Sequence, residues 1–258
     1  MKDINKITFI GSGNVATHLA IALKEAGKEI VRIYSRTPAN AKALAGKVDA
    51  DFTNNTEDIA GEADIYIVAV SDDALLQTAE KLNFNDGLVV HTSGSAQMDI
   101  LKGCSENYGV FYPLQTFSKS RKVDFNKIPL CIEANNPGSR EQLKNLALSL
   151  TDKLYFVNSE KRRTLHLAAV FACNFPNFMY SVAQKILRKN ELDFDILKPL
   201  IKETAEKVQQ ISPADAQTGP AKRGDDKIMK LHIEMLKDYP EFQELYKIIS
   251  EGIREMEF

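Results

Sequence analysis

The stretch Ile7-Thr8-Phe9-Ile10-Gly11-Ser12-Gly13-Asn14-Val15-Ala16 predicts the fold of the first half of the chain. Its apolar run indicates a buried strand, its glycines a tight turn, and the amphipathic residues after it a helix. Gly11 lets the backbone reverse, Gly13 leaves room for a pyrophosphate, and Ala16 lets the helix pack close to the strand. We therefore expect residues 11–16 to bind the phosphates of a dinucleotide at the start of the helix.

A second expected strand, residues 29–34, runs into Ser35-Arg36-Thr37. Sites selective for NAD place an acidic residue at this point, where it binds the ribose hydroxyl, whereas a cation favours the 2′-phosphate of NADP. We therefore predict that these three residues contact the adenosine end of the cofactor and that the cofactor is NADP(H). The alternative is that Arg36 is a solvated charge at the end of a strand.

The composition is that of an ordinary globular protein, with 44% apolar residues in a chain of 258. The net charge of −2 gives no electrostatic reason to expect nucleic acid or an anionic membrane as a partner. Cys104, Cys131 and Cys173 are odd in number and widely spaced, which fits neither a disulfide framework nor a metal site. A strand is expected close to Met1, which leaves no room for a signal peptide, and no apolar run reaches membrane-spanning length. These features predict a cytoplasmic protein without a metal.

Short β-type runs alternate with helical patterns through the first half, which is typical of a parallel sheet with helices on both faces. We expect a doubly wound α/β domain of the Rossmann type over residues 1–157. Further strands are expected at residues 63–70, 88–90, 109–111, 130–133 and 154–157, and further helices at residues 38–45 and 139–150.

Several of these strands end in polar residues, and such loops lie along the carboxyl edge of a parallel sheet, where ligands bind. Val70 and Ser71 follow the most apolar strand, and His91-Thr92-Ser93 follow the next one. We expect these five residues to contact the cofactor, with the last three beside the nicotinamide. Gln115 follows another strand and is expected to contact the substrate.

Strand-type alternation ends near Asn158, and helical patterns cover residues 160–189, 194–210, 226–237 and 240–256. We expect a smaller, all-helical domain over residues 158–258 that binds the substrate and forms a homodimer. The first pattern is more apolar than one exposed face requires, which burial against a second subunit explains. Pro176 inside it predicts a kink or a split of the helix just after Asn174.

His166 and Asn174 stand eight residues apart on this apolar helix and therefore project from similar faces. A reduction that moves a hydride also needs a proton donor and a group that orients the substrate. Histidine suits the first role because its reference pKa is about 6.5, and asparagine suits the second. The alternatives are a hydrogen-bonded core histidine and a structural asparagine.

The segment TGPAKRGD at residues 218–225 joins two expected helices. A guanidinium on a tight loop suits bidentate binding of a carboxylate, so we expect Arg223 to bind the acid group of the substrate. Thr218, Gly219 and Asp225 are expected beside it. Turn formation explains the glycines and the proline equally well, and Asp225 is also placed to cap the next helix.

Several motifs occur together in this chain: GSGNVA at residues 11–16, HTSG at 91–94, PLQTF at 113–117, His166 with Asn174, and TGPAKRGD at 218–225 followed by His232, which we expect in the core. With these marks the chain resembles a bacterial family of NADP oxidoreductases in which a Rossmann-like half is joined to a helical half. The resemblance spans all 258 residues. More distantly, the layout is similar to that of pyrroline-5-carboxylate reductase, ketopantoate reductase and the 6-phosphogluconate dehydrogenase superfamily.

The resemblance implies a cleft that contains His166, Asn174 and Arg223, and an NADPH-dependent reduction of a small carbonyl or imine compound that carries a carboxylate. Family members commonly have His where this chain has Tyr112, and a phenol, with a reference pKa of about 10, is a poor proton reservoir. Reduction of ketopantoate, reduction of a proline-type imine and exchange with a deazaflavin are alternatives within this class. A non-catalytic module that senses NADP(H) is the alternative from another class.

Overall fold

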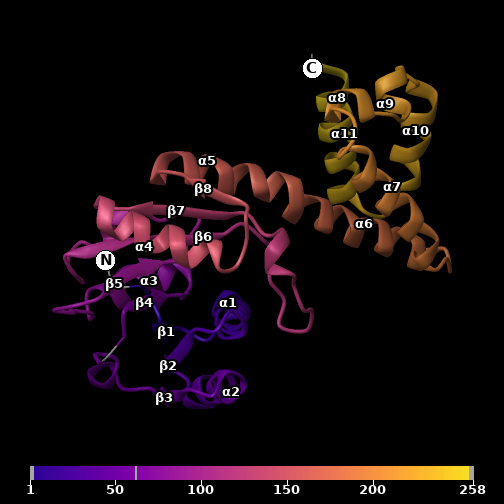
Figure 1. Ribbon diagram of the computed structural model, residues 1–258. Helices are drawn as coiled ribbons and strands as arrows, with labels where there is room; N and C mark the ends of the chain where they lie inside the picture. Colours follow the sequence, from indigo (N-terminus) through magenta and orange to yellow (C-terminus); the bar gives the residue numbers. More distant parts are fainter. Residues whose placement is uncertain (1–2, 62, 256–258) are drawn as a thin grey trace. The chain divides into compact units, whose positions relative to one another are not determined.

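The computed structural model describes residues 3–61 and 63–255 of the chain. The chain forms two compact units, Met1–Cys173 and Asn174–Phe258, and each is described by itself. The first unit contains an eight-stranded sheet with its helices, and the regular elements of the second are helices wherever the structure describes them (Figure 1).

The strands follow the order β3-β2-β1-β4-β5-β6-β7-β8 across the sheet. The first six run parallel, in the 3-2-1-4-5-6 order of dinucleotide-binding sheets, so the predicted Rossmann-type fold is confirmed. The strand order reverses between β1 and β4, which opens a crevice at their carboxyl ends. The bounds are β1 (Lys6–Ile10), β2 (Glu29–Tyr34), β3 (Asp51–Thr53), β4 (Ile65–Val68), β5 (Leu88–His91), β6 (Asn107–Pro113), β7 (Leu130–Ala134) and β8 (Leu154–Phe156).

The sheet departs from the parallel arrangement at one pair of strands. β7 runs antiparallel to β6, with Pro113 opposite Leu130, whereas β8 runs parallel to β7. A parallel connection needs a crossover, usually a helix, but residues 114–129 return the chain with only the short 3-10 turn Phe125–Lys127. The expected βαβ unit at the end of the sheet is present, with α4 (Pro137–Leu148) between β7 and β8.

Side chains of the central strands alternate between two cores. Ile65 and Ile67 pack in the core that includes α1 (Asn14–Glu25), α2 (Pro38–Val48) and α4. Tyr66 and Val68 pack in the core that includes α3 (Asp72–Ala79). Because both faces are buried, these strands read as nearly continuous apolar runs in the sequence.

The first unit extends beyond its sheet because α5 (Ser159–Ala169) is bound to β7. Arg162 of α5 is fully buried, and its Nη1 donates to Glu133 Oε2 at 2.5 Å. The Ser159 hydroxyl donates to the same oxygen at 2.7 Å. β8 is the last strand and α5 follows it, whereas the sequence placed the domain boundary between residues 157 and 158 and the compact units divide after Cys173.

The chain stays helical from α5 through a π-helical turn, Val170–Asn174, into α6 (Phe175–Lys189). Pro176 lies in the first turn of α6, where it cannot donate to the carbonyl four residues before it. A π-helical turn is one of the ways in which a helix accommodates such a lost bond. It separates α5 from α6 at the place where the sequence predicted a kink or a split.

The second unit continues with helices that match three of the predicted patterns and with two short ones that the sequence did not reveal. The short helices each have a proline at an N-terminal position, which is favourable there, but four residues show no periodicity. Residue 256, the end of the last predicted pattern, lies outside the described residues. After the 3-10 turn Phe194–Leu197 the helices are α7 (Lys198–Lys207), α8 (Pro213–Ala216), α9 (Pro220–Arg223), α10 (Asp226–Met235) and α11 (Pro240–Glu255).

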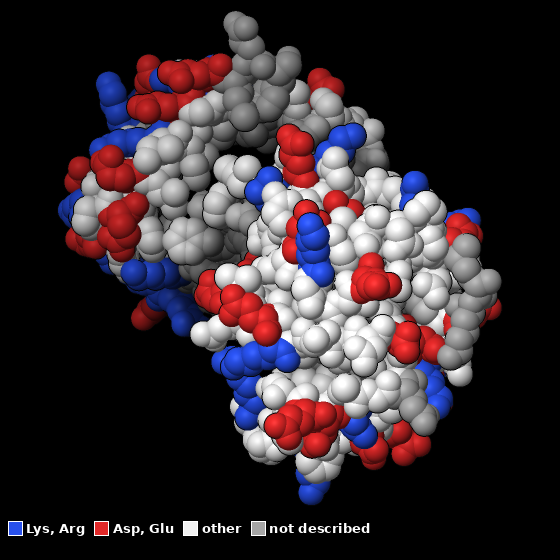
Figure 2. Space-filling model, turned by 90° about the vertical axis from the view of Figure 1, so that its left-hand side faces the viewer, with Lys and Arg blue, Asp and Glu red and all other residues white. Residues whose placement is uncertain are grey.

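On the face drawn in Figure 2, acidic and basic side chains are interspersed with uncharged ones. This mixture agrees with the small net charge of −2. None of the helices within residues 3–61 and 63–255 combines the length and the apolar character needed to cross a bilayer.

Candidate active site

A cavity of about 540 Å³ opens at the carboxyl edge of the sheet in the first unit. Its walls come from the loops that follow β1, β2, β4, β5 and β6, together with α3 and α5. Ligands bind at this position in sheets of this topology. The predicted site residues that line the cavity are Gly11, Ser12, Gly13, Asn14, Val15, Ser35, Arg36, Val70, Ser71, Thr92, Ser93, Gln115 and His166.

Gly11 and Gly13 of the first loop differ in backbone conformation and in the space around them. Gly11 has a φ of +119°, and an added Cβ would lie 2.2 Å from the carbonyl oxygen of Ala69, so the fold requires it. Gly13 has a φ of −73°, which any residue adopts, and an added Cβ would meet no atom of the described residues within 4 Å. The space in front of Gly13 is therefore available to a ligand. Ala16 does not line the cavity but is fully buried in the core, as close packing of helix and strand requires.

The helices α1 and α3 both begin at this cavity, and they differ in charge. Among the described residues, α1 has neither a side-chain cap nor an acidic residue in its first turn. α3 follows Ser71 and carries Asp72 and Asp73 in its first turn. Each helix start leaves backbone N–H groups unpaired, but the two carboxylates already complement the positive end of α3. An anionic ligand is therefore favoured at α1.

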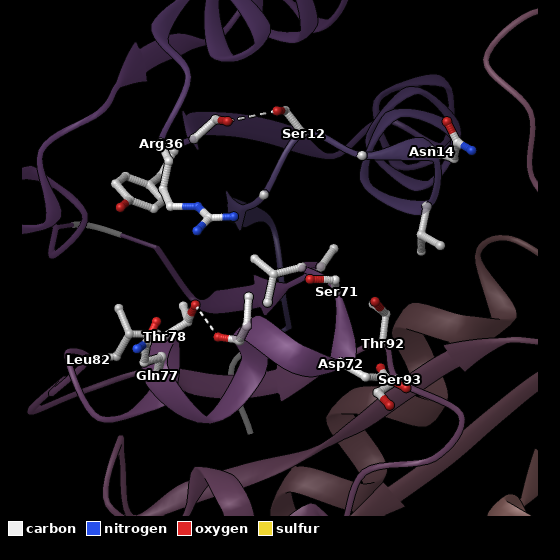
Figure 3. Close-up of a pocket in the computed structure, with 18 of the residues that line it drawn as sticks. Ser12, Asn14, Arg36, Ser71, Asp72, Gln77, Thr78, Leu82, Thr92 and Ser93 are labelled. Carbon is white, nitrogen blue, oxygen red and sulfur yellow. Dashed lines mark hydrogen bonds between the residues drawn. The ribbon is translucent and has the colours of Figure 1, made fainter.

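Arg36 follows β2, and its guanidinium points into the cavity between the loop of Ser12 and the helix that carries Gln77 and Thr78 (Figure 3). The Ser12 hydroxyl donates to the Ser35 hydroxyl at 2.9 Å, and both side chains are buried. This bond joins the loops that follow β1 and β2.

Thr37 departs from the expectation, because it is not among the cavity-lining residues and precedes α2 as its N-cap. Its backbone N–H donates to the Ser35 hydroxyl at 3.4 Å. Thr37 therefore stabilises the loop of Arg36 through its backbone and does not face the cavity.

His91 also departs from the expectation, because its side chain is fully buried behind the loop and is not among the lining residues. Its Nδ1 accepts a hydrogen bond from the Ser93 N–H at 3.1 Å, and its Nε2 faces the Gln97 carbonyl oxygen at 3.3 Å. These two bonds require a neutral ring with its proton on Nε2. Burial, with a contribution from the charge of Arg162, lowers the pKa of His91 to about 4. His91 thus shapes the loop whose residues Thr92 and Ser93 line the cavity.

The same loop is held from two other sides. The Ser95 hydroxyl donates to Asp72 at the start of α3. Arg162 of α5 donates to the Ala96 carbonyl oxygen and, at 3.1 Å, to the Ser159 hydroxyl. No local sequence pattern marks the ion pair of buried Arg162 with Glu133, because the two residues are 29 positions apart.

His166 of α5 contacts Tyr112 near the end of β6. The Tyr112 Oη and His166 Nδ1 atoms lie 3.1 Å apart, the rings meet edge to face, and both residues line the cavity. Burial, the main cause, raises the pKa of Tyr112 to about 12, so its hydroxyl is protonated at neutral pH. Gly94 makes this approach possible, since an added Cβ there would lie 2.6 Å from His166 Nδ1.

The remaining predicted site residues belong to the second unit. Asn174 ends the π-helical turn and is exposed, and Arg223 ends α9 and is also exposed. Asp225 caps α10 by accepting a hydrogen bond from the Ile228 N–H at 3.2 Å. Asp225 therefore has the helix-capping role that the sequence offered as the alternative to substrate binding.

A second cavity, of about 310 Å³, lies within the second unit, and most of its walls are aliphatic or aromatic side chains. Thr218 and Gly219 line it, whereas Arg223 does not. His232 is half-buried on one wall, with its Nδ1 2.9 Å from Tyr246 Oη. His232 is thus hydrogen-bonded but only partly buried, and it is not part of the buried core clusters among the described residues.

Sequence patterns missed the face of α3, and of the turn after it, that lines the first cavity and carries three polar side chains. Ala74, Gln77, Thr78 and Lys81 all line the first cavity, and they stand at positions i, i+3, i+4 and i+7. This spacing places them on one side of a helix. Once Ser71 is taken as the start of the helix, the same spacing could have been read from the sequence.

Comparisons with known proteins match both parts of the chain. Residues 6–94 match the family described as NADP oxidoreductase, coenzyme F420-dependent, and residues 128–253 match a domain of unknown function, DUF2520. A comparison with curated proteins gives no match.

Solved structures extend the match to nearly the whole chain. An imine reductase from Myxococcus stipitatus in complex with NADP+ is 16% identical, with 97% of this chain and 93% of that chain covered and a TM-score of 0.68. A 1-pyrroline-5-carboxylate reductase from Streptococcus pyogenes is 15% identical, with 97% and 98% covered and a TM-score of 0.66. At these identities the two likenesses show the fold alone.

A protein from Bacteroides fragilis that is assigned as an NADP oxidoreductase is much closer in sequence. It is 45% identical, with 98% of this chain and 99% of that chain covered and a TM-score of 0.92. Such identity over nearly the full length of both chains establishes kinship, and the present chain therefore belongs to this family of NADP oxidoreductases.

Proposed function

We propose that the protein uses NADPH to reduce a small carbonyl or imine compound that carries a carboxylate. The observation that carries this proposal is that one cavity contains the bare start of α1, the guanidinium of Arg36 and the pair of His166 and Tyr112. A phosphorylated dinucleotide needs the first two, and a reduction that takes up a proton needs the third.

The residues at the sheet edge fit the cofactor. The free N–H groups of α1 and the open space at Gly13 suit a diphosphate. Arg36 and Lys81 both line the cavity, and two cations suit a 2′-phosphate. Val70, Ser71 and the loop of Thr92 and Ser93 line the rest of the cavity and are proposed to hold the nicotinamide end.

NADPH, when bound, supplies the hydride. We assign the accompanying proton to His166, whose charged ring would give one proton to the substrate oxygen or nitrogen and remain as the neutral imidazole. Gln115 lines the same cavity and offers an amide to the substrate. Positioning of the substrate beside the nicotinamide supplies most of the remaining rate enhancement.

The substrate roles of the second unit rest on the sequence motifs. We propose that Asn174 orients the reacting oxygen or nitrogen and that Arg223 binds the carboxylate. Both side chains are exposed in the unit as described, so a ligand can reach them. Thr218 and Gly219 belong to the same motif and are proposed to shape the loop.

A homodimer through the second unit is also proposed. Phe178, Ile196, Leu200, Met235 and Ile248 are large apolar side chains that are each more than half exposed. Extensive exposed apolar surface marks interaction sites. Light scattering should give twice the mass of one chain, and a monomer at micromolar concentration would contradict the proposal.

Two experiments test the function. Calorimetry should show that NADPH binds more tightly than NADH. A panel of 2-oxo acids, ketopantoate and cyclic imino acids should then contain a compound that oxidises NADPH, measured by its absorbance. Cyclic imines are included because an imine reductase shares this fold.

The outcomes separate the alternatives. Turnover confined to ketopantoate or to a proline-type imine would identify that reaction. Turnover confined to a deazaflavin would replace the proposed substrate class. Tight binding of NADPH without any turnover would favour the sensing module and overturn the proposal.

A further inference from the structure

The hydroxyl of Tyr112 takes part in a hydrogen bond with a side chain of α5. Within the described part of the chain, its hydrogen-bond partner is Nδ1 of His166, at 3.1 Å. Tyr112 is only 9% exposed, and a buried hydroxyl without an acceptor is unfavourable. Because burial raises the pKa of Tyr112 to about 12, the hydroxyl keeps its proton and can donate it to Nδ1.

With the Tyr112 hydroxyl as its donor, this bond leaves the proton of the neutral His166 ring on the other nitrogen. A neutral imidazole has one donor and one acceptor nitrogen, so Nδ1 as acceptor leaves the proton on Nε2. We infer that Tyr112, together with Gly94, holds His166 in the tautomer with its proton on Nε2, which makes Tyr112 a positioning residue for the proton donor. Only the use of that proton rests on the proposed function.

Gly94 lies against the Nδ1 side of the His166 ring. A Cβ at this position would lie 2.6 Å from His166 Nδ1 and 2.8 Å from its Cγ. It would also lie 2.9 Å from Cζ of Tyr112. Gly94 and Tyr112 thus lie against the Nδ1 side of a ring whose residue lines the cavity, and we place Nε2 on the side towards the cavity.

The arrangement keeps a proton on Nε2 in both ionisation states that precede transfer. Tyr112 donates to Nδ1 of the neutral ring, and it accepts from the Nδ1–H of the charged ring, because a hydroxyl can do both. When the charged ring gives its Nε2 proton to the substrate, the ring is left with its proton on Nδ1, which is the tautomer that the resting bond from Tyr112 disfavours. The proton on Nε2 is then replaced from solvent.

Nitrogen NMR of the full-length protein labelled with ¹⁵N-histidine measures the tautomer without cofactor or substrate. Spectra are recorded at alkaline pH, where the nitrogen shifts of residue 166 no longer change with pH, so that they report the neutral ring. His166→Gln identifies the signals of residue 166 by their loss. We expect the wild type to show a protonated Nε2 and an unprotonated Nδ1.

Tyr112→Phe removes the hydroxyl and keeps the ring, and it should convert the spectrum of His166 to a mixture of both tautomers. Tyr108→Phe is the matched control, because Tyr108 lies on the same strand but outside the cavity lining. It should leave the His166 signals unchanged. Should Tyr112→Phe fail to fold, the spectrum of the wild type still decides.

A wild-type ring with its proton on Nδ1, or an unchanged His166 spectrum in Tyr112→Phe, would overturn the inference. With an accepted substrate, Tyr112→Phe should lower kcat by about 3- to 10-fold, as expected for one lost hydrogen bond, and change KM by less than about twofold. A changed tautomer with an unchanged kcat would leave the inference standing and would instead contradict His166 as the proton donor.

Discussion

Each unit of this protein contains a histidine that is hydrogen-bonded to a tyrosine, but the residues around the two pairs differ. His166 and Tyr112 lie 3.1 Å apart, His232 and Tyr246 lie 2.9 Å apart, and both pairs have edge-on rings. The first pair lines the cavity that also holds the glycine loop and Arg36, whereas the second lies between a mostly apolar cavity and a hollow with charged side chains, and neither of these is lined by that glycine loop. The hydrogen bond is the same in both, so the neighbouring groups decide whether such a pair can take part in catalysis.

The largest expected difference is in turnover. His166→Gln removes the proposed proton donor and should lower kcat by about 100- to 10,000-fold. His232→Gln should leave kcat within about threefold and lower the melting temperature instead, because it breaks a bond inside the second unit. Steady-state kinetics and thermal unfolding of both variants measure the two effects. Equal losses of turnover would remove the distinction between the pairs.

The first pair also depends on a loop that requires a neutral His91. The pKa of His91 in the folded protein is about 4, below its usual value of 6.5, so the unfolded chain binds the proton first as the pH falls. Neutral His91 therefore contributes roughly 3 kcal/mol to the free energy of unfolding above about pH 6.5. This contribution is lost as the pH falls to about 4. Urea unfolding at several pH values measures it. The dependence should be weaker in His91→Gln, and an identical dependence would contradict the assignment.

Crowding the first pair should reduce turnover without affecting the cofactor loop. In Gly94→Ala the new Cβ would displace the His166 ring, which lies 2.6 Å from it, and kcat should fall by about 100-fold. Gly103→Ala is the control, because a Cβ there meets no atom of the described chain within 4 Å. NADPH affinity should stay within about threefold in both variants. Normal turnover in Gly94→Ala would show that the contact with His166 is dispensable.

The two units are also expected to bind different ligands, and an arginine in each tests this. Arg36→Ala should weaken NADPH binding by about 10- to 100-fold, the value of a charge-assisted hydrogen bond, and leave NADH binding unchanged. Arg223→Ala should change neither coenzyme affinity by more than about twofold and should raise KM for the substrate. Calorimetry with both coenzymes checks the first statement, and kinetics the second. Equal loss of NADH and NADPH binding in Arg36→Ala would place its guanidinium away from the 2′-phosphate.

The central strands of the sheet were predictable because strands buried on both faces leave direct marks in the sequence. The predicted residues 29–34 coincide with β2, and the apolar runs of β1, β4 and β5 fall where they were expected. β3 was not predicted, since it has three residues, lies at the sheet edge and leaves Phe52 46% exposed. The antiparallel direction of β7 depends on how a 16-residue connection, residues 114–129, returns the chain, and no local pattern encodes that.

Those residues of the candidate site that directly follow a strand were predictable from the sequence. Gly11, Ser35 and Arg36 follow strands, and their positions come from the order of elements. Contacts between distant side chains were not predictable, because Tyr112 and His166 are 54 residues apart. The position of the His91 side chain was not predictable either. The sequence locates the end of β5 but does not tell on which side of the following loop the His91 ring lies.

The central claim is that the open space before Gly13 receives the diphosphate of the cofactor. Calorimetric titration of NADPH into Gly13→Ala tests it, with Gly46→Ala as control, because neither added Cβ meets a described protein atom within 4 Å. Both variants should keep their stability within about 1 kcal/mol. We predict that NADPH binding is weaker by about tenfold or more in Gly13→Ala and unchanged in Gly46→Ala. Unchanged NADPH affinity in Gly13→Ala would contradict the account.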